Sequence, residues 1–259
     1  MPIHQTARTF GARRVPTTTT ASGCWQLGEV TQARRANIWP TDVDPFFSDV
    51  SLLMLFNGTS GSTTFTDSSS NGLAFTASGN AQISTVQSKF GGASGFFDGT
   101  GDYINSNTTT SALTFGTGDF TIEFWLYFTS TPAGGVLQQT PTSAPALYIN
   151  IDTTFGVRIG RHGAAQLSAA SDTLTANAWN HLAFVRSSGN VKIFFDGVSQ
   201  TVTNTGGGIG GYDYFATRAI EIGRTADAGL DGYIDSLRIT KAARYSQNFT
   251  PQTTDFLTA

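Results

Sequence analysis

The sequence predicts an all-β fold, a two-sheet antiparallel sandwich preceded by a short extended or helical N-terminal arm. Three observations predict it. Charged residues make up only 13% of the 259 residues, which is about half the usual share. Twenty phenylalanines supply enough apolar surface for a packed core. From Val50 onward, short stretches alternate apolar and polar residues, and turn residues separate them at intervals of about ten.

The first 47 residues are expected to form an anchoring arm. In the stretch "GCWQLGEVTQARRANIWP", apolar residues recur at helical spacing, which predicts one short helix near residues 26–36. A helix of this length is marginal alone, so it needs a surface to pack on. The side chains expected to dock the arm on a partner are Trp25, Leu27, Val30, Arg34, Arg35 and Trp39.

Charge is distributed unevenly along the chain. Residues 1–40 carry five arginines and one glutamate, a net charge of +4, whereas the remaining 10 basic and 17 acidic residues give −7. Such asymmetry is typical of an arm that meets an acidic partner or a protein surface. No nucleic-acid-binding motif accompanies the arginines, so nucleic acid is not an expected partner.

The sequence predicts neither a membrane span, nor a secretory signal, nor an internal disulfide. No stretch approaches the ~18 apolar residues that span a membrane, so we expect no membrane insertion. The first sixteen residues have arginines but no apolar core, so we expect no secretory signal. The single cysteine, Cys24, cannot form an internal disulfide and is expected to pack as a small apolar residue.

Residues 48–259 are expected to form the sandwich. "DFTIEFWLYFT" alternates two sets of residues. The first set is predicted to form a core face: Phe120, Ile122, Phe124, Leu126 and Phe128. The second set is predicted to form a partly solvated face: Thr121, Glu123, Trp125, Tyr127 and Thr129. "WNHLAFVRSSGNVKIFFDG" predicts two strands joined by a turn at Ser187–Asn190. Further strands are predicted in "ALYINID", "FGVRIGR", "AIEIGR" and "DGYIDSLRIT".

The order of these motifs resembles that of concanavalin A-like, laminin G-like jelly-roll domains of bacterial and bacteriophage proteins. The resemblance covers roughly residues 50–256 and is carried by "SLLMLFNGTSGSTTFTDSSSNG", "KFGGASGFFDGTGDYI", "GDFTIEFWLYF", "WNHLAFVRSSGNVKIFFDG" and "DGYIDSLRITKAARYSQNFTP". It implies the concanavalin A-like jelly-roll fold. It does not select a function, because this fold carries lectins, glycosidases, adhesion modules and structural domains.

The arm carries a second resemblance. Its "GxWxLxEVxxARRxxxWP"-like stretch resembles the leader of structural proteins in the virions of tailed phages. Cys24 stands where a small apolar residue is expected, which is a mild departure. The resemblance implies a virion protein that is assembled in the host cytoplasm and whose partners are other capsid or tail proteins. A homo-oligomer is expected.

Catalytic residues are not expected. Glycoside hydrolysis needs a pair of carboxylates at a fixed separation, whereas Glu123 and Glu221 are each solitary in their strands. His162 and His181 are expected to be structural, because no metal-type spacing or nucleophile elbow accompanies them. The formal G-x-G-x-x-G in "TNTGGGIGGYDYF" lacks a following helix pattern, so it predicts a loop rather than a nucleotide site.

The sequence offers two candidate binding sites, one for a metal ion and one for a glycan or another partner. A structural Ca²⁺ would be held by the carboxylates of Asp98, Asp102, Asp231 and Asp235, although aspartates in turns also cap their own backbone. A glycan or other partner would contact Tyr212, Asp213 and Tyr214 in the glycine-rich loop. Trp125 and Tyr127 on the non-core face are further glycan candidates, unless the second sheet covers them.

These observations predict a non-enzymatic virion structural protein, a capsid decoration or a tail-associated, fibre-type subunit. Its arm would dock on the particle, and its jelly roll would be displayed for protein contact or for adhesion to host surface glycans. A bacterial carbohydrate-binding lectin is the alternative, and a glycoside hydrolase the third hypothesis.

Overall fold

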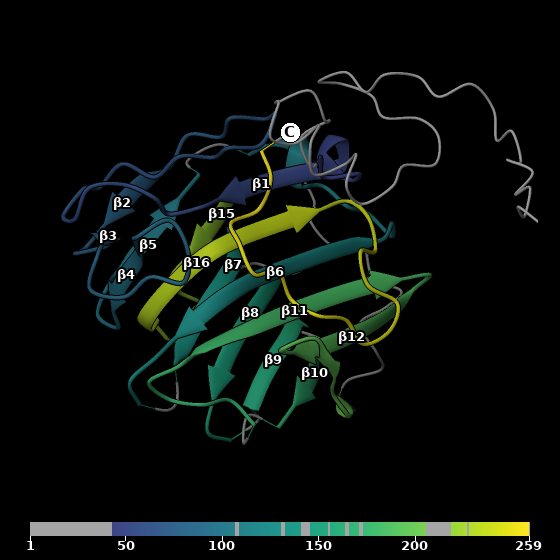
Figure 1. The fold of residues 1–259 in the computed structure, drawn as a ribbon. Coiled ribbons are helices and arrows are strands. Elements are labelled where there is room, and N and C mark those ends of the chain that lie inside the picture. Colours follow the sequence, from purple (N-terminus) through teal and green to yellow (C-terminus); the bar gives the residue numbers. More distant parts are fainter. Residues whose placement is uncertain are drawn as a thin grey trace, which may run out of the picture. The chain divides into compact units, whose positions relative to one another are not determined.

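Two antiparallel sheets form the part of the chain that the structure, a computed structural model, describes (Figure 1). The chain divides into two units, and the sandwich is the unit Phe46–Phe256. The described residues are 43–106, 109–130, 133–140, 146–154, 156–163, 166–170, 173–205, 219–226 and 228–258. The all-β, two-sheet sandwich predicted from the sequence is confirmed. The arm, its helix near residues 26–36 and its docking side chains lie outside the described residues.

The first sheet, called here the β6 sheet, lies at the front of Figure 1. Its strands in spatial order are β13 (Val198–Ser199), β12 (Asn190–Phe195), β11 (Trp179–Ser187), β6 (Phe120–Tyr127), β16 (Asp231–Thr240), β4 (Ser94–Asp98) and β3 (Gln82–Ser84). Strand β1 (Val50–Met54) also pairs with β16. A bulge at Ser236, where φ is +46°, separates the half of β16 that pairs with β4 from the half that pairs with β1.

The second sheet, called here the β8 sheet, lies behind the first in Figure 1. Its strands in spatial order are β14 (Val202–Thr205), β10 (Gln166–Ala169), β9 (Gly156–Arg161), β8 (Leu147–Asp152), β7 (Gly134–Thr140), β15 (Ala219–Ile222), β5 (Tyr103–Asn105) and β2 (Thr76–Ser78). The described helical structure is two 3₁₀ turns, η1 (Phe47–Asp49) and η2 (Ser111–Leu113). None of the described helices is long and apolar enough to cross a membrane.

The predicted hairpin is present. Strands β11 and β12 pair with Ser187 opposite Asn190, which leaves Ser188 and Gly189 as a two-residue loop. Both loop residues have positive φ, +50° and +78°. This is the backbone of a type I′ turn, whose twist matches that of the flanking strands.

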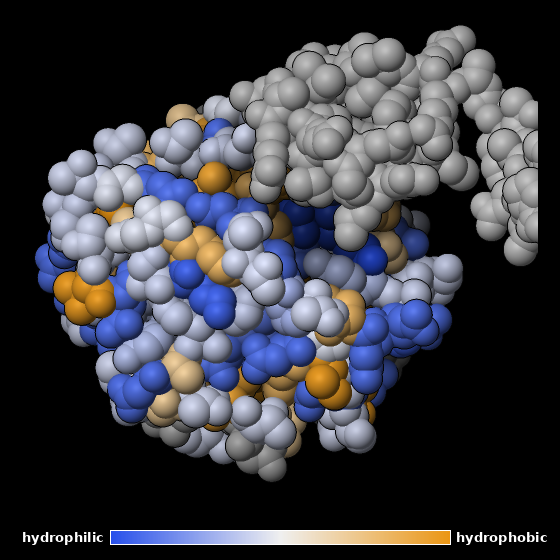
Figure 2. Space-filling model, in the orientation of Figure 1, coloured by the Kyte–Doolittle hydropathy of each residue, from blue (hydrophilic) through white to orange (hydrophobic). Residues whose placement is uncertain are grey.

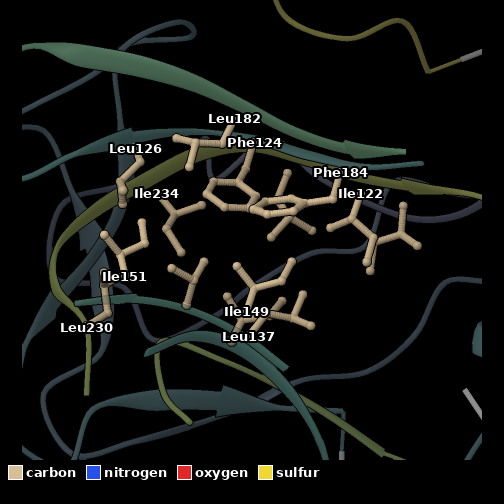
Figure 3. Packing of buried hydrophobic residues seen from close by; sticks show 14 of the residues in the cluster. Ile122, Phe124, Leu126, Leu137, Ile149, Ile151, Leu182, Phe184, Leu230 and Ile234 are labelled. Carbon is tan, nitrogen blue, oxygen red and sulfur yellow. The ribbon is translucent and has the colours of Figure 1, made fainter. Parts of the chain in front are cut away.

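The predicted core face of β6 is also confirmed. Phe120, Ile122, Phe124 and Leu126 are fully buried against the inner face of the β8 sheet, where Ile149 is one of their partners in the same cluster (Figure 3). Each such side chain contributes about 1.5–3 kcal/mol relative to an exposed one. The sandwich therefore draws its stability from the interdigitated inner faces of its two sheets.

The other face of β6 differs from the expectation. It was predicted to be partly solvated, but Thr121 and Glu123 are fully buried and Trp125 is only 6% exposed. The segment 241–256, which follows β16 and passes back in front of the β6 sheet, covers Thr121 and Glu123 (Figure 1). In this segment, Phe249 packs together with Ala243 and Tyr245 on a small apolar cluster. The cluster consists of Ala183 and Val185 of β11 and Phe194 of β12. Lys89 and Phe90 cover Trp125.

The visible surface of this side is mixed. The space-filling view shows hydrophobic residues in scattered groups among hydrophilic ones, without one continuous apolar patch (Figure 2). Among the described residues, the large apolar side chains that are exposed are Val43, Val86, Val198 and Leu257.

Candidate functional site

Glu123 lies at the centre of a buried ionic cluster beneath the segment 241–256. Its Oε1 accepts hydrogen bonds from Nε and Nη2 of Arg238 on β16, at 3.0 and 2.7 Å. Its Oε2 accepts the hydroxyl of Tyr245 at 2.8 Å and lies 3.5 Å from Nε2 of His181. The guanidinium of Arg244 is 3.9 Å from Oε1. Both carboxylate oxygens therefore have protein partners.

Electrostatics keep Glu123 ionised. Burial alone would raise the pKa of this carboxyl, but the charge of Arg238 and the contact with His181 outweigh it and lower the pKa to about 2. A glycosidase acid needs a raised pKa and access to the glycosidic oxygen, and Glu123, at 0% exposure, has neither. The solitary glutamate of β6 holds the C-terminal segment to the sheet.

The second solitary glutamate is also engaged. Glu221 on β15 is buried and forms a bidentate ion pair with Arg224, at 2.8 and 2.7 Å. Its Oε2 also accepts the side-chain amide of Gln138 at 2.7 Å. His181 lies on β11 of the β6 sheet and is fully buried, with the rings of Trp125 and Phe249 packed edge-on against it.

The four predicted calcium ligands lie in two separate places. Asp98 on β4 and Asp231 on β16 are direct cross-strand neighbours, and Asp102 lies in the turn beside Asp98. Asp235 is four residues further along β16, or ~13 Å at the usual rise per residue. In the part of the chain that the structure describes, no group of three or more His, Cys, Asp or Glu side chains is placed to hold a metal ion.

The carboxylates of Asp98 and Asp102 accept hydrogen bonds from backbone N–H groups in the neighbouring turns. Asp102 accepts the backbone N–H groups of Asn80 and Asp98, and Asp98 accepts that of Thr100. The side-chain amide of Asn80 and the N–H of Thr100 lower the pKa of Asp98. These contacts are the backbone capping that competes with calcium as an explanation. Calcium binding stays a prediction.

Asp235 differs from these turn aspartates. It is fully buried, and its Oδ2 accepts the N–H groups of Lys89 and Phe90, at 2.8 and 3.0 Å. Its Oδ1 has no hydrogen-bond partner among the described residues. Burial, with a contribution from the neighbouring carboxylate of Asp255, raises the pKa of Asp235 to about 7.

The predicted aromatic candidates divide into three groups. Trp125 is covered by Lys89, whose Nζ lies 3.8 Å from the centre of the indole, and by Phe90. The covering therefore comes from a loop of the same chain, and not from the second sheet. Tyr127 is half-buried on the same face. The loop residues Tyr212, Asp213 and Tyr214, and the glycine motif before them, lie outside the described residues.

A polar face, not predicted from the sequence, lies on the outside of the β8 sheet. Leu137, Ile149 and Ile220 point into the core, so the residues that alternate with them point outward. Register places Gln138 of β7 directly beside Tyr148 of β8 and beside Glu221 of β15. We define the polar face by Gln138, Tyr148, Asn150, Arg158 and Glu221.

A tyrosine ring lies flat on this face. Tyr148 is opposite Gly160 of β9, and a Cβ atom at Gly160 would come within 2.6 Å of the ring. Glycine is therefore needed there for the ring to lie across the strand. The hydroxyl of Tyr148 donates to Oε1 of Gln166 at 2.8 Å, and the ring of His162 is 4.8 Å away.

Two side-chain carbonyl oxygens of the polar face accept no hydrogen bond from the described residues. Gln138 and Asn150 are each 3% exposed, and each donates its amide N–H to a carboxylate, Glu221 at 2.7 Å and Asp152 at 3.5 Å. These contacts fix the orientation of both amides. Oε1 of Gln138 and Oδ1 of Asn150 have no hydrogen-bond partner among the described residues. Such an acceptor costs about 1–3 kcal/mol, so it indicates a bound water or ligand.

The margin of the polar face reaches solvent. Asn105, Arg158, His162 and Gln166 are half-buried around its buried centre. Arg158 bridges Asp152 and Gln166, at 2.5 and 3.2 Å. The face therefore combines hydrogen-bond acceptors, guanidinium donors and an aromatic ring within four adjacent strands. These are the groups that orient a polyhydroxylated ligand.

A sequence signal for this face exists in hindsight. In "LYINID", Tyr148, Asn150 and Asp152 alternate with core residues, so polar groups with one aromatic share one face. The pattern predicts a strand, but it does not show that Gln138 lies beside Tyr148. That neighbour comes from a strand pairing whose register the bulge in β7 sets.

The fold and the polar face together define a lectin-like jelly-roll domain. The chain belongs to the concanavalin A-like lectin/glucanases superfamily, because the Laminin_G_3 family model matches residues 98–248, more than half of the chain. The resemblance to concanavalin A-like and laminin G-like domains is thereby confirmed. The resemblance of the arm to phage leaders stays a prediction. A search of curated proteins found no match.

Solved structures share the fold at low identity. Domain 4 of AbnA, an extracellular GH43 arabinanase from Geobacillus stearothermophilus solved with arabinotriose, has a TM-score of 0.56 and 16% identity over 75% of this chain and 93% of that one. The binding domain of botulinum neurotoxin serotype G has a TM-score of 0.53 and 13% identity, over 76% of this chain and 48% of its own.

A third structure extends this group. The binding domain of botulinum neurotoxin DC, solved with rat synaptotagmin II, has a TM-score of 0.53 and 14% identity, over 77% of this chain and 50% of its own. This chain therefore spans about half the length of the toxin binding domains that it matches. At these identities the likeness shows the fold alone.

Proposed function

We propose that the protein is a non-enzymatic structural component of a bacteriophage virion whose jelly roll binds glycans through the polar face. The observation that carries the glycan part is the pair of buried, unpartnered carbonyl oxygens of Gln138 and Asn150 beside the flat ring of Tyr148. A sugar offers hydroxyl donors to such acceptors. The arabinotriose bound by domain 4 of the arabinanase supports the choice of ligand class.

The non-enzymatic part rests on the two glutamates. Glu123 and Glu221 lie in different sheets, and each is buried in an ion pair with an arginine. Neither is a free acid or base that faces a ligand on the polar face. The domain therefore would hold a glycan without cleaving it, as an adhesion module does.

Removal of the unpartnered acceptors should weaken glycan binding. The near-isosteric variants Gln138→Met and Asn150→Leu should each lose about tenfold in affinity, because a hydrogen bond of about 1.4 kcal/mol is lost. The measurement is a glycan array, followed by calorimetry of the full chain with the best glycan. Thr203→Val, an exposed change on β14, is the matched control. If no glycan binds, or the two variants bind as well as the control, the polar face is not the site.

The virion part rests on the sequence of the arm and is tested separately. The full chain and a version that begins at Ser48 would each be produced during phage infection, and virions analysed by mass spectrometry. We expect only the full chain to co-purify, because the predicted docking side chains all precede residue 48. Retention of both versions would place docking on the jelly roll. Loss of both would favour a bacterial carbohydrate-binding lectin.

A further inference from the structure

Four aromatic side chains form a row across the outer face of the β6 sheet. Phe96 of β4, Tyr233 of β16, Tyr127 of β6 and Trp179 of β11 are consecutive cross-strand neighbours in register. Their strand neighbours Phe97, Ile234 and Leu126 are buried in the main core, so the four rings point outward. We call this set the aromatic row.

The row is regular and open. Its successive ring centres are 5.0, 5.8 and 5.6 Å apart, from Phe96 to Tyr233, Tyr127 and Trp179. All four side chains are half-buried, so each presents part of its ring to solvent. The next row along the strands, which contains Trp125, is covered by Lys89 and Phe90. The aromatic row is thus the part of this face that the covering segments leave open.

The exposed area of the row is small. Aromatic side chains of ~150–250 Å² that are half-buried leave on the order of 300 Å² at the surface in total. A stable protein interface takes about 800 Å² from each partner. The row therefore suits a narrow ligand better than a protein surface.

The polar groups of the row fit the same kind of ligand. Tyr127 and Tyr233 carry hydroxyls, Trp179 carries an indole N–H, and Gln82 of β3 continues the register beyond Phe96 with an amide. All five side chains are uncharged. An extended neutral chain that crosses the strands would meet a ring on each of four strands, with a hydrogen-bonding group beside most of them. A linear polysaccharide has this repeat, with an apolar ring face and edge hydroxyls in every unit.

We propose that the aromatic row is a second binding surface, for a linear, uncharged polysaccharide that runs across the strands of the β6 sheet. The row shares no residue with the polar face of the β8 sheet. Its ligand must be extended, since four consecutive rings need several consecutive sugar units.

The dependence of affinity on the number of sugar units tests this proposal. Calorimetry of the full-length protein would use cello-, laminari-, xylo- and arabino-oligosaccharides of one to six units. For at least one series, the affinity should rise with each unit up to about four, one for each aromatic ring, and then level off. A monosaccharide should bind the row too weakly to measure. Binding that does not depend on length, or no binding in any series, would overturn the proposal.

Variants assign the binding to the row. Trp179→Ala and Tyr127→Ala should each weaken tetrasaccharide binding by about tenfold, the effect of losing a major aromatic contact. Tyr127→Phe keeps the ring and should lose no more than about threefold, which separates stacking from the hydroxyl. Val198→Ala, an exposed change on β13 of the same sheet, is the control and should leave the affinity unchanged. Equal losses in Gln138→Met would assign the tetrasaccharide to the polar face and overturn the proposal.

Discussion

Replacing Glu123 with glutamine is expected to cost about 3–5 kcal/mol of the free energy of unfolding at pH 7. The substitution removes the counter-charge of Arg238, which is only 7% exposed at its side chain, and of Arg244 beside it. A buried cation without a partner is strongly destabilising, although the intact pair itself adds little net stability. The carboxylate also accepts the hydroxyl of Tyr245, so the segment 241–256 loses its buried polar attachment.

The measurement is urea unfolding of the wild type and the variant. Glu221→Gln is the matched control, because its partner Arg224 is 36% exposed at its side chain and can be solvated when the carboxylate is lost. We expect that variant to lose about 1 kcal/mol. In the double variant Glu123→Gln with Arg238→Met, much of the loss should be recovered, since the buried positive charge that Glu123 neutralises is removed with it. Equal losses in the two single variants would show that burial of the pair does not matter.

The pH dependence has a defined sign. The pKa of Glu123 is about 2 in the folded state and near 4.5 ordinarily, so the folded state favours the ionised form. Its contribution, about 3 kcal/mol, is present above pH 4.5 and is lost as the pH falls toward 2. The difference between the wild type and Glu123→Gln should therefore narrow between pH 4.5 and pH 2. A constant difference over this range would contradict the ion pair.

Local patterns predict the strands of this fold well. The period-two alternation of Phe120–Tyr127 identifies a core face that the structure confirms, because alternation depends only on the backbone. The hairpin at Ser187–Asn190 follows from its short turn with glycine at a positive φ. These are contacts between residues close in sequence, so a short stretch contains the information.

The candidate sites depend on contacts that no short stretch contains. Alternation alone places Glu123 on an accessible face, yet its buried partners Arg238 and Tyr245 are more than a hundred residues away in the sequence. The aromatic row takes one residue from each of four strands, and only the register of their pairing aligns them. In the same way, Asp231 and Asp235 are neighbours in sequence but reach different surroundings, because β16 is long enough to separate them.

Replacing Asp235 with asparagine is expected to stabilise the protein at pH 8. Burial raises the pKa of Asp235 to about 7 from an ordinary value of 3.8, so the folded state holds the proton more tightly than the unfolded state. Wild-type stability then falls as the pH rises from 3.8 to 7, by on the order of 4 kcal/mol. Asparagine keeps a carbonyl oxygen for the N–H groups of Lys89 and Phe90 but carries no charge beside Asp255.

The stability difference between the wild type and Asp235→Asn is measured by thermal and urea unfolding at pH 8 and pH 4, first in EDTA. The advantage of Asp235→Asn should be large at pH 8 and should shrink toward pH 4, where the wild-type carboxyl is protonated in the folded state. Asp231→Asn, at an exposed position on the same strand, should change stability by less than about 0.5 kcal/mol at either pH. Repetition in CaCl₂ tests the calcium prediction, because a bound ion would neutralise Asp235 and abolish the advantage of the asparagine. An advantage that persists unchanged in CaCl₂ would remove Asp235 from the set of calcium ligands. The buried charge of Asp235 would then only lower the stability of the folded state.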